Sequence, residues 1–170
     1  EVALIMERWL VDYVKPSEIQ AEFPQIDVGK LAFYYEEGRL IEGEFIVSWD
    51  SVERSYQQKI DDEEFHMEYA KWILPLIKRW RLKGYDKMLY AGISMGSLGL
   101  VRGRPWYRLS DWETKEAASI GMGPFNNKIR VDSYGFAIGK DGGTSLEFEK
   151  GDDSKLDEVL DMLVAQELVV

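Results

Sequence analysis

The sequence contains no cysteine and only one histidine, His66, among its 170 residues. Without cysteine there can be no disulfide, no thiolate zinc site and no cysteine nucleophile, which is typical of a reducing compartment. A single histidine offers little for a metal site or for acid–base catalysis at neutral pH. We therefore expect no metal and no cofactor, and the composition favours a role other than catalysis.

Long apolar runs are also absent. No stretch reaches the ~18 residues that a membrane-spanning helix needs. The first 15 residues include Glu7, Arg8 and Asp12, which the apolar core of a secretion signal would not carry. We therefore expect a cytoplasmic protein without a membrane partner.

The composition otherwise favours a folded chain. Hydrophobic residues make up 45% and aromatic residues 13% of the sequence, which is enough for a packed core. No repeat or flexible linker divides the chain, and its length suits one domain over residues 1–170, with two small lobes as the alternative.

Hydrophobic periodicity and turn residues predict both helices and strands. The helices are expected at 2–14, 51–60, 61–83, 111–119 and from 152 to the last turns of the chain. The strands are expected at 31–35, 40–49, 87–93, 98–101, 106–109, 129–138 and 144–148. This pattern predicts an α+β domain with a mixed or mainly antiparallel sheet and N-terminal, central and C-terminal helices.

The segment 61–83 has the clearest helical signals. Four acids open it, four bases fall in its last turns and Gly84 follows, an order that complements the helix dipole. Pro75 should kink or restart the helix. One apolar stripe is expected to lie in the core: Phe65, Tyr69, Trp72, Ile73, Leu76 and Trp80.

Charge is segregated along the chain. Residues 71–108 hold nine Lys and Arg against one acid, a balance of +8, whereas the whole chain carries −10 and the remainder therefore −18. Opposed fields of this size suggest recognition of a charged partner. The bases could equally neutralise the acidic flanks within the molecule.

An acidic, aromatic region is the first candidate site. Carboxylates among large aromatic side chains suit a surface that docks a basic protein, although a solvated hairpin edge would have the same composition. Its residues are Tyr34, Tyr35, Glu36, Glu37, Glu42, Glu44 and Trp49.

The basic segment 71–108 is the second candidate. Arginines beside aromatic side chains can grip phosphate, a carboxylate-rich surface or a stacked base. The candidate residues are Arg102, Arg104, Arg108 and Trp106, which would bind an anionic ligand or RNA.

Residues 92–96 match the G-x-S-x-G pattern of a serine nucleophile, with Ser94 at its centre. In hydrolases of that type the serine is followed by a helix and, later in the chain, by a histidine. Here the residues after Ser94 resemble a strand and His66 precedes it, so a glycine-rich turn between strands is the competing interpretation.

The leading functional hypothesis is a small acidic protein-binding module, an inhibitor or immunity-type protein that masks a basic partner. This hypothesis depends on size and charge rather than on a motif. A serine-dependent hydrolase using Ser94 and an anion- or RNA-binding protein using segment 71–108 are the alternatives.

Overall fold

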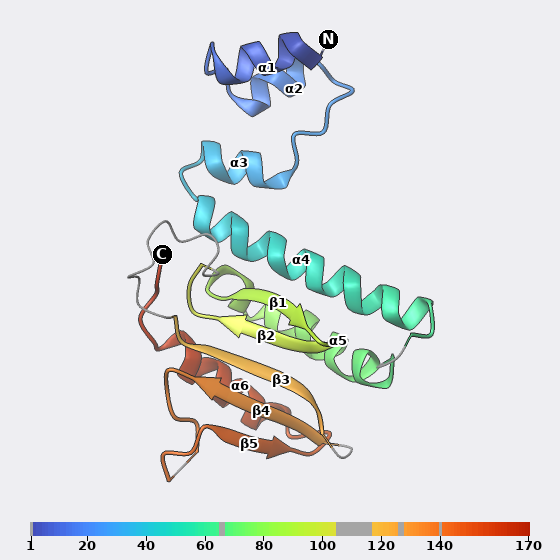
Figure 1. The fold of residues 1–170 in the computed structure, drawn as a ribbon, viewed down its shortest axis with the longest axis vertical. Coiled ribbons are helices and arrows are strands. Elements are labelled where there is room, and N and C mark those ends of the chain that lie inside the picture. Colours follow the sequence, from blue (N-terminus) through green and yellow to red (C-terminus); the bar gives the residue numbers. More distant parts are fainter. Residues whose placement is uncertain (1, 65–66, 105–116, 126–127, 140) are drawn as a thin grey trace.

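The computed structural model describes residues 2–64, 67–104, 117–125, 128–139 and 141–170. Within them the chain forms helices followed by a β-meander and a last helix (Figure 1), which confirms the α+β class. The helices are α1 (Val2–Leu10), α2 (Pro16–Glu22), α3 (Lys30–Glu36), α4 (Leu40–Asp61), α5 (Met67–Leu82), the short 3-10 helix η1 (Tyr85–Lys87) and α6 (Asp153–Val164). The strands are β1 (Tyr90–Ser94), β2 (Ser97–Val101), β3 (Ser119–Phe125), β4 (Lys128–Tyr134) and β5 (Ser145–Phe148).

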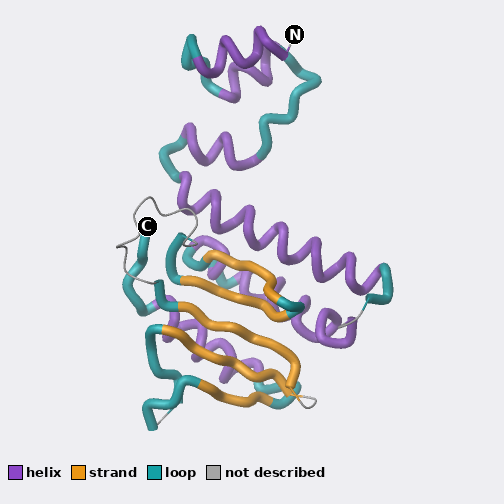
Figure 2. The backbone as a smooth tube through the Cα atoms, in the orientation of Figure 1, coloured by secondary structure: helices purple, strands orange, loops and turns teal. Residues whose placement is uncertain are grey.

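The five strands form one antiparallel sheet in the order β1-β2-β3-β4-β5. Alternation along each strand turns one face inward, including the cross-strand row Leu98, Met122 and Val131. Helix α5 lies behind β1 and β2, and α6 lies behind β3 and β4 (Figures 1 and 2). The core therefore sits between this face of the sheet and helices α5 and α6, and α4 adds Trp49, Val52 and Tyr56 to it.

The strands expected at 31–35 and 40–49 are wrong, because these residues lie in α3 and α4. Aromatic and branched side chains favour strands locally. In α4, however, Phe45, Trp49, Val52 and Tyr56 recur at helical spacing and bury one continuous face. Burial of that face outweighs the local strand preference, and the helix predicted at 51–60 is the second half of the same element.

Helix α4 runs beside β1 and covers the backbone at this edge of the sheet. The Ser48 hydroxyl accepts a hydrogen bond from the Ala91 backbone N–H at 2.9 Å. The Trp49 indole N–H donates to the Leu89 carbonyl at 2.7 Å. An unpaired strand edge can form hydrogen bonds with another chain, and these bonds from α4 hinder such pairing at β1.

The predicted helix at 61–83 begins later than expected, because Asp61 ends α4 and α5 starts at Met67. Helix α4 extends to Asp61, the first of the four acids at 61–64, because its packing stabilises the helix, although carboxylates are unfavourable at a helix C-terminus. Helix α5 continues through Pro75 and ends before Gly84, whose φ of 84° is the left-handed conformation expected there.

The apolar stripe of α5 is confirmed for most of its members. Tyr69, Ile73, Leu76 and Trp80 are buried, whereas Trp72 is only partly buried and packs against the edge of the core. Phe65 lies outside the described residues, as does His66.

The C-terminal half differs from expectation mainly at β3. Its glycines and Pro124 are poor strand formers, yet each of its seven residues pairs with β4. The helix expected at 111–119 is wrong at its end, because Ser119 begins β3. The rest of that helix up to 116, and the strand expected at 106–109, lie outside the described residues. The strands near 87–93, 98–101, 129–138 and 144–148 and the last helix are confirmed with shifted ends.

Near the N-terminus, the helix expected at 2–14 ends at Leu10 as α1. The following segment, which lacks clear periodicity, contains the short helix α2. Pro16 occupies its first turn, where the missing backbone N–H costs nothing.

Candidate protein-binding surfaces

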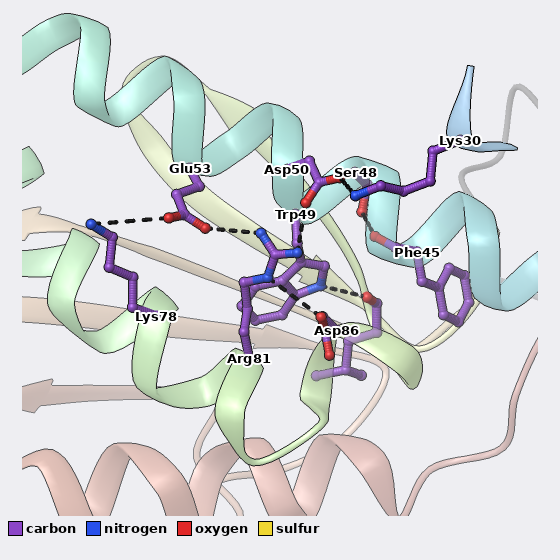
Figure 3. Close-up of polar contacts among 10 residues, drawn as sticks. Lys30, Phe45, Ser48, Trp49, Asp50, Glu53, Lys78, Arg81 and Asp86 are labelled. Atoms are coloured by element: carbon purple, nitrogen blue, oxygen red, sulfur yellow. Dashed lines mark hydrogen bonds and ion pairs between the residues drawn. The ribbon is translucent and has the colours of Figure 1, made fainter. Parts of the chain in front are cut away.

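Arg81 at the end of α5 is the centre of a partly buried ion-pair cluster (Figure 3). Its guanidinium contacts Asp50 at 2.6 Å and Glu53 at 2.8 Å, both on α4, and Asp86 at 3.4 Å. Lys30 binds Asp50 from α3 at 2.7 Å. The cluster therefore ties α3, α4, α5 and η1 together, and three carboxylates already bind the Arg81 guanidinium.

A second cluster joins α5 to α6. Arg79 contacts Asp153 at 2.5 Å and Asp157 at 2.7 Å. Asp157 also accepts hydrogen bonds from Lys83 at 2.6 Å and from the Trp80 indole N–H at 2.7 Å. The bases in the last turns of α5 thus complement the helix dipole and also bind acids of the C-terminal helix.

Two of the three arginines proposed for anion binding, Arg102 and Arg104, are held in place by other parts of the chain. Arg104 forms a two-pronged ion pair with the buried carboxylate of Glu44 at 2.7 and 2.8 Å. Arg102 donates to the carbonyls of Met88 and Gln166 at 2.7 and 3.3 Å. Burial lowers the pKa of its guanidinium. Arg108 and Trp106 lie outside the described residues.

The acidic, aromatic candidate region is divided by the fold. Trp49 is in the core and Glu44 is buried against Arg104, so neither reaches the surface of the folded chain. Both errors come from the interpretation of residues 40–49 as a strand. Successive side chains of a strand point to opposite faces, whereas helix α4 turns both of these side chains inward. Tyr34 and Tyr35 lie on α3, with Tyr35 largely exposed.

The remaining carboxylates of this region have structural partners. Glu36 accepts bonds from the backbone N–H and the hydroxyl of Ser17, both at 2.7 Å, and these bonds lower its pKa. Glu37 and Glu42 each contact Arg39 at 2.7 Å. Glu36 therefore links α2 to α3, while the other two carboxylates stay near the surface in a local ion-pair group.

Beside the Arg81 cluster lies a charged cleft of about 710 Å³ along the outer side of α4. It is lined by Lys30, Asp50, Glu53, Arg54, Gln57, Gln58, Asp61, Asp62 and Arg81. Acids and bases alternate here, and most of them bond to one another. The cleft presents no single charge that would select one class of ligand.

A second concavity is apolar and belongs to the N-terminal helices. This N-terminal groove has a volume of about 490 Å³ and is lined by Trp9, Leu10, Tyr13, Pro16, Val28, Leu31, Ala32, Tyr35 and Leu40. Sequence reasoning missed it because residues 31–35 were interpreted as a strand. The helical spacing of Val28, Leu31, Ala32 and Tyr35 is the signal that could have indicated it.

Ser94 lies at the end of β1 in a two-residue hairpin turn. Ser94 and Ser97 are opposite one another, and Met95 and Gly96 between them have φ of 49° and 83°. Positive φ at both positions is typical of the tight turns that join twisted antiparallel strands. This confirms the glycine-rich turn between strands, and a strand rather than a helix follows the serine.

We expect Ser94 to be unreactive towards a fluorophosphonate probe. The serine is exposed, and none of the described side chains forms a hydrogen bond with it; a hydroxyl without an adjacent base is a poor nucleophile. Mass spectrometry of the treated protein checks this. Stoichiometric labelling at Ser94 that disappears in Ser94→Ala would instead support a serine-dependent hydrolase.

Two interhelical aspartates should make stability sensitive to acid. Burial alone would raise the pKa of Asp50 and of Asp157. Bonds from Lys30 and Arg81 lower the pKa of Asp50. Bonds from Lys83, Arg79 and Trp80 lower the pKa of Asp157. Below the ordinary carboxyl pKa of about 3.8 the unfolded chain therefore binds more protons than the folded chain.

We accordingly expect the free energy of unfolding to fall as the pH falls from about 5 towards the lowered pKa values. Urea unfolding at a series of pH values measures this dependence. Asp157→Asn should flatten it, and an unchanged pH profile in that variant would contradict the assignment.

Among the described residues, no three His, Cys, Asp or Glu side chains are grouped so as to hold a metal ion. In the same residues, no helix combines the length and hydropathy that crossing a bilayer requires. Comparison of this chain with protein-family models, with curated proteins and with solved structures finds no match.

Proposed function

We propose that this protein is a small acidic module that binds a positively charged protein. The supporting observation is the internal use of its bases: Arg79, Arg81 and Arg104 each contact carboxylates of other elements. The strongest cluster of positive charge is therefore compensated within the fold, and the formal charge of −10 belongs to the molecule as a whole. Such a field attracts cationic partners and speeds their association.

An inhibitor or immunity-type role is the more specific form of this proposal, in which binding masks a basic surface of the partner. It is supported by analogy of size and charge alone. Binding of RNA through segment 71–108 has less support, because a phosphate would have to displace the carboxylates that already bind these arginines.

A selection experiment tests the proposal on the intact protein. The protein is immobilised at physiological salt and offered a randomised phage-displayed peptide library, with a fluorescent oligouridine strand tested in parallel. We expect the recovered peptides to be positively charged, and their affinity to fall as salt is raised, because exposed charges are screened over ~8 Å at physiological ionic strength.

A charge variant provides the control. Glu7, Glu18, Glu63 and Glu158 are exposed, and their carboxylates form no ion pair with any described residue, so changing all four to Gln should leave folding intact. This variant should associate more slowly with the selected peptides and with a weaker salt dependence. Recovery of neutral or acidic peptides, or binding of oligouridine alone, would overturn the proposal.

A further inference from the structure

The N-terminal groove is built by elements that stand apart from the main core. Helix α1 buries none of its residues, and it packs on α2, which in turn reaches α4 through α3 (Figures 1 and 2). The large side chains that line the groove remain open to solvent: Trp9 is 51% and Tyr35 63% exposed. A concave group of exposed aromatic and aliphatic side chains on a highly charged protein is a typical feature of an interaction site.

The charges around the groove are predominantly negative. Residues 2–36 contain six acids and three bases, a balance of −3. Arg8, next to Trp9, is already bound by Asp12 at 3.3 Å and Glu22 at 3.1 Å, and Lys30 is bound by Asp50. Glu7 and Glu18 are exposed on α1 and α2, the helices that contribute Trp9 and Pro16 to the groove, so a cationic partner that reaches these helices meets carboxylates.

We propose that the N-terminal groove receives the apolar side chains of a cationic amphipathic segment of the partner protein. This inference rests on the proposed function and assigns its contact surface. Trp9 and Tyr35 would provide anchors that become buried on binding, and Lys or Arg residues flanking the partner's apolar side chains would meet the exposed carboxylates of α1 and α2. The groove volume lies within the range of roughly 300–1,000 Å³ that is usual for binding pockets.

The same charges argue against two other occupants. A second copy of this chain would bring its own charge of −10 to the interface, which opposes association. The cytoplasmic face of a membrane carries anionic lipids and attracts basic rather than acidic segments.

The test uses the cationic peptides selected on the intact protein and two matched double variants. Trp9→Ser with Tyr35→Ser removes the anchors, both of which are exposed, so the fold should persist. Leu82→Ser with Tyr134→Ser removes apolar side chains outside the groove that are at least as exposed, since Tyr134 is also 63% and Leu82 90% exposed. We expect the first variant to weaken peptide affinity by about tenfold or more and the second to leave it unchanged.

The outcomes distinguish failure of the groove assignment from failure of the proposed function. Cationic peptides that bind the groove variant as tightly as the wild type would overturn the groove assignment and leave the proposed function intact. Failure to select cationic peptides would overturn both. Analytical ultracentrifugation and flotation with phosphatidylserine-containing vesicles complete the test: a dimer or vesicle binding that is lost in the groove variant would give the groove a different occupant and overturn the inference.

Discussion

Replacing Trp80 by alanine should lower the free energy of unfolding by about 3–5 kcal/mol, because it opens a large cavity between α5, α6 and the sheet. Trp80 is completely buried in the core cluster. Its indole N–H also binds Asp157, which would lose one of its hydrogen-bond donors. Urea unfolding followed by circular dichroism measures the change.

Trp72→Ala is the matched control on the same helix. Trp72 is only partly buried and its ring lies under the Lys150 ammonium group, so its loss should cost clearly less. Trp80→Phe refines the comparison, since it keeps an aromatic ring in the core and removes the indole N–H. Equal unfolding midpoints for Trp80→Ala and the wild type would refute the position of α5 in the core.

Arg81→Met should cost about 2–4 kcal/mol at neutral pH. The substitution keeps much of the aliphatic stem but leaves Asp50, Glu53 and the buried Asp86 without their shared cation. Removing one partner of a buried ion pair is expensive because the remaining charges stay desolvated. Here the carboxylates would also repel one another.

Lys78→Met provides the comparison for Arg81. Lys78 reaches the same Glu53 only at 4.0 Å from an exposed position, so its loss should cost less than about 1 kcal/mol. The defect of Arg81→Met should shrink as the pH falls towards 4, because the bond from Arg81 that helps to lower the pKa of Asp50 is lost in the variant. A cost equal to that of Lys78→Met, or independent of pH, would show that the cluster contributes little to stability.

The parts of the fold that could be predicted are those in which local signals and burial agree. Helix α5 combines an apolar stripe, bases in its last turns and Gly84 at its end. The turn after Ser94 combines a glycine-rich segment with strand-like sequence on both sides. In both places propensity, pattern and tertiary packing favour the same structure.

Residues 31–49 could not be predicted in this way. Their aromatic and branched side chains favour strands, and only the burial of one face of α4 against β1 and α5 selects the helix. That error also affected the candidate site, because it placed Glu44 and Trp49 on a surface. The N-terminal groove depends on contacts among α1, α2 and α3, which periodicity within one segment does not reveal.

The sequential order of the strands has a consequence for how the chain folds. Each strand pairs with its immediate neighbour along the chain, so the sheet can grow by successive antiparallel pairings, of which β1–β2 and β3–β4 are close in sequence. Contacts that are local in sequence favour fast folding. By contrast, the parallel bridge of Gly103 with Val169 joins the segment after β2 to the C-terminal tail, and it closes a loop that contains β3, β4, β5 and α6. We therefore expect this bridge to be among the last contacts made during folding and among the first broken during unfolding.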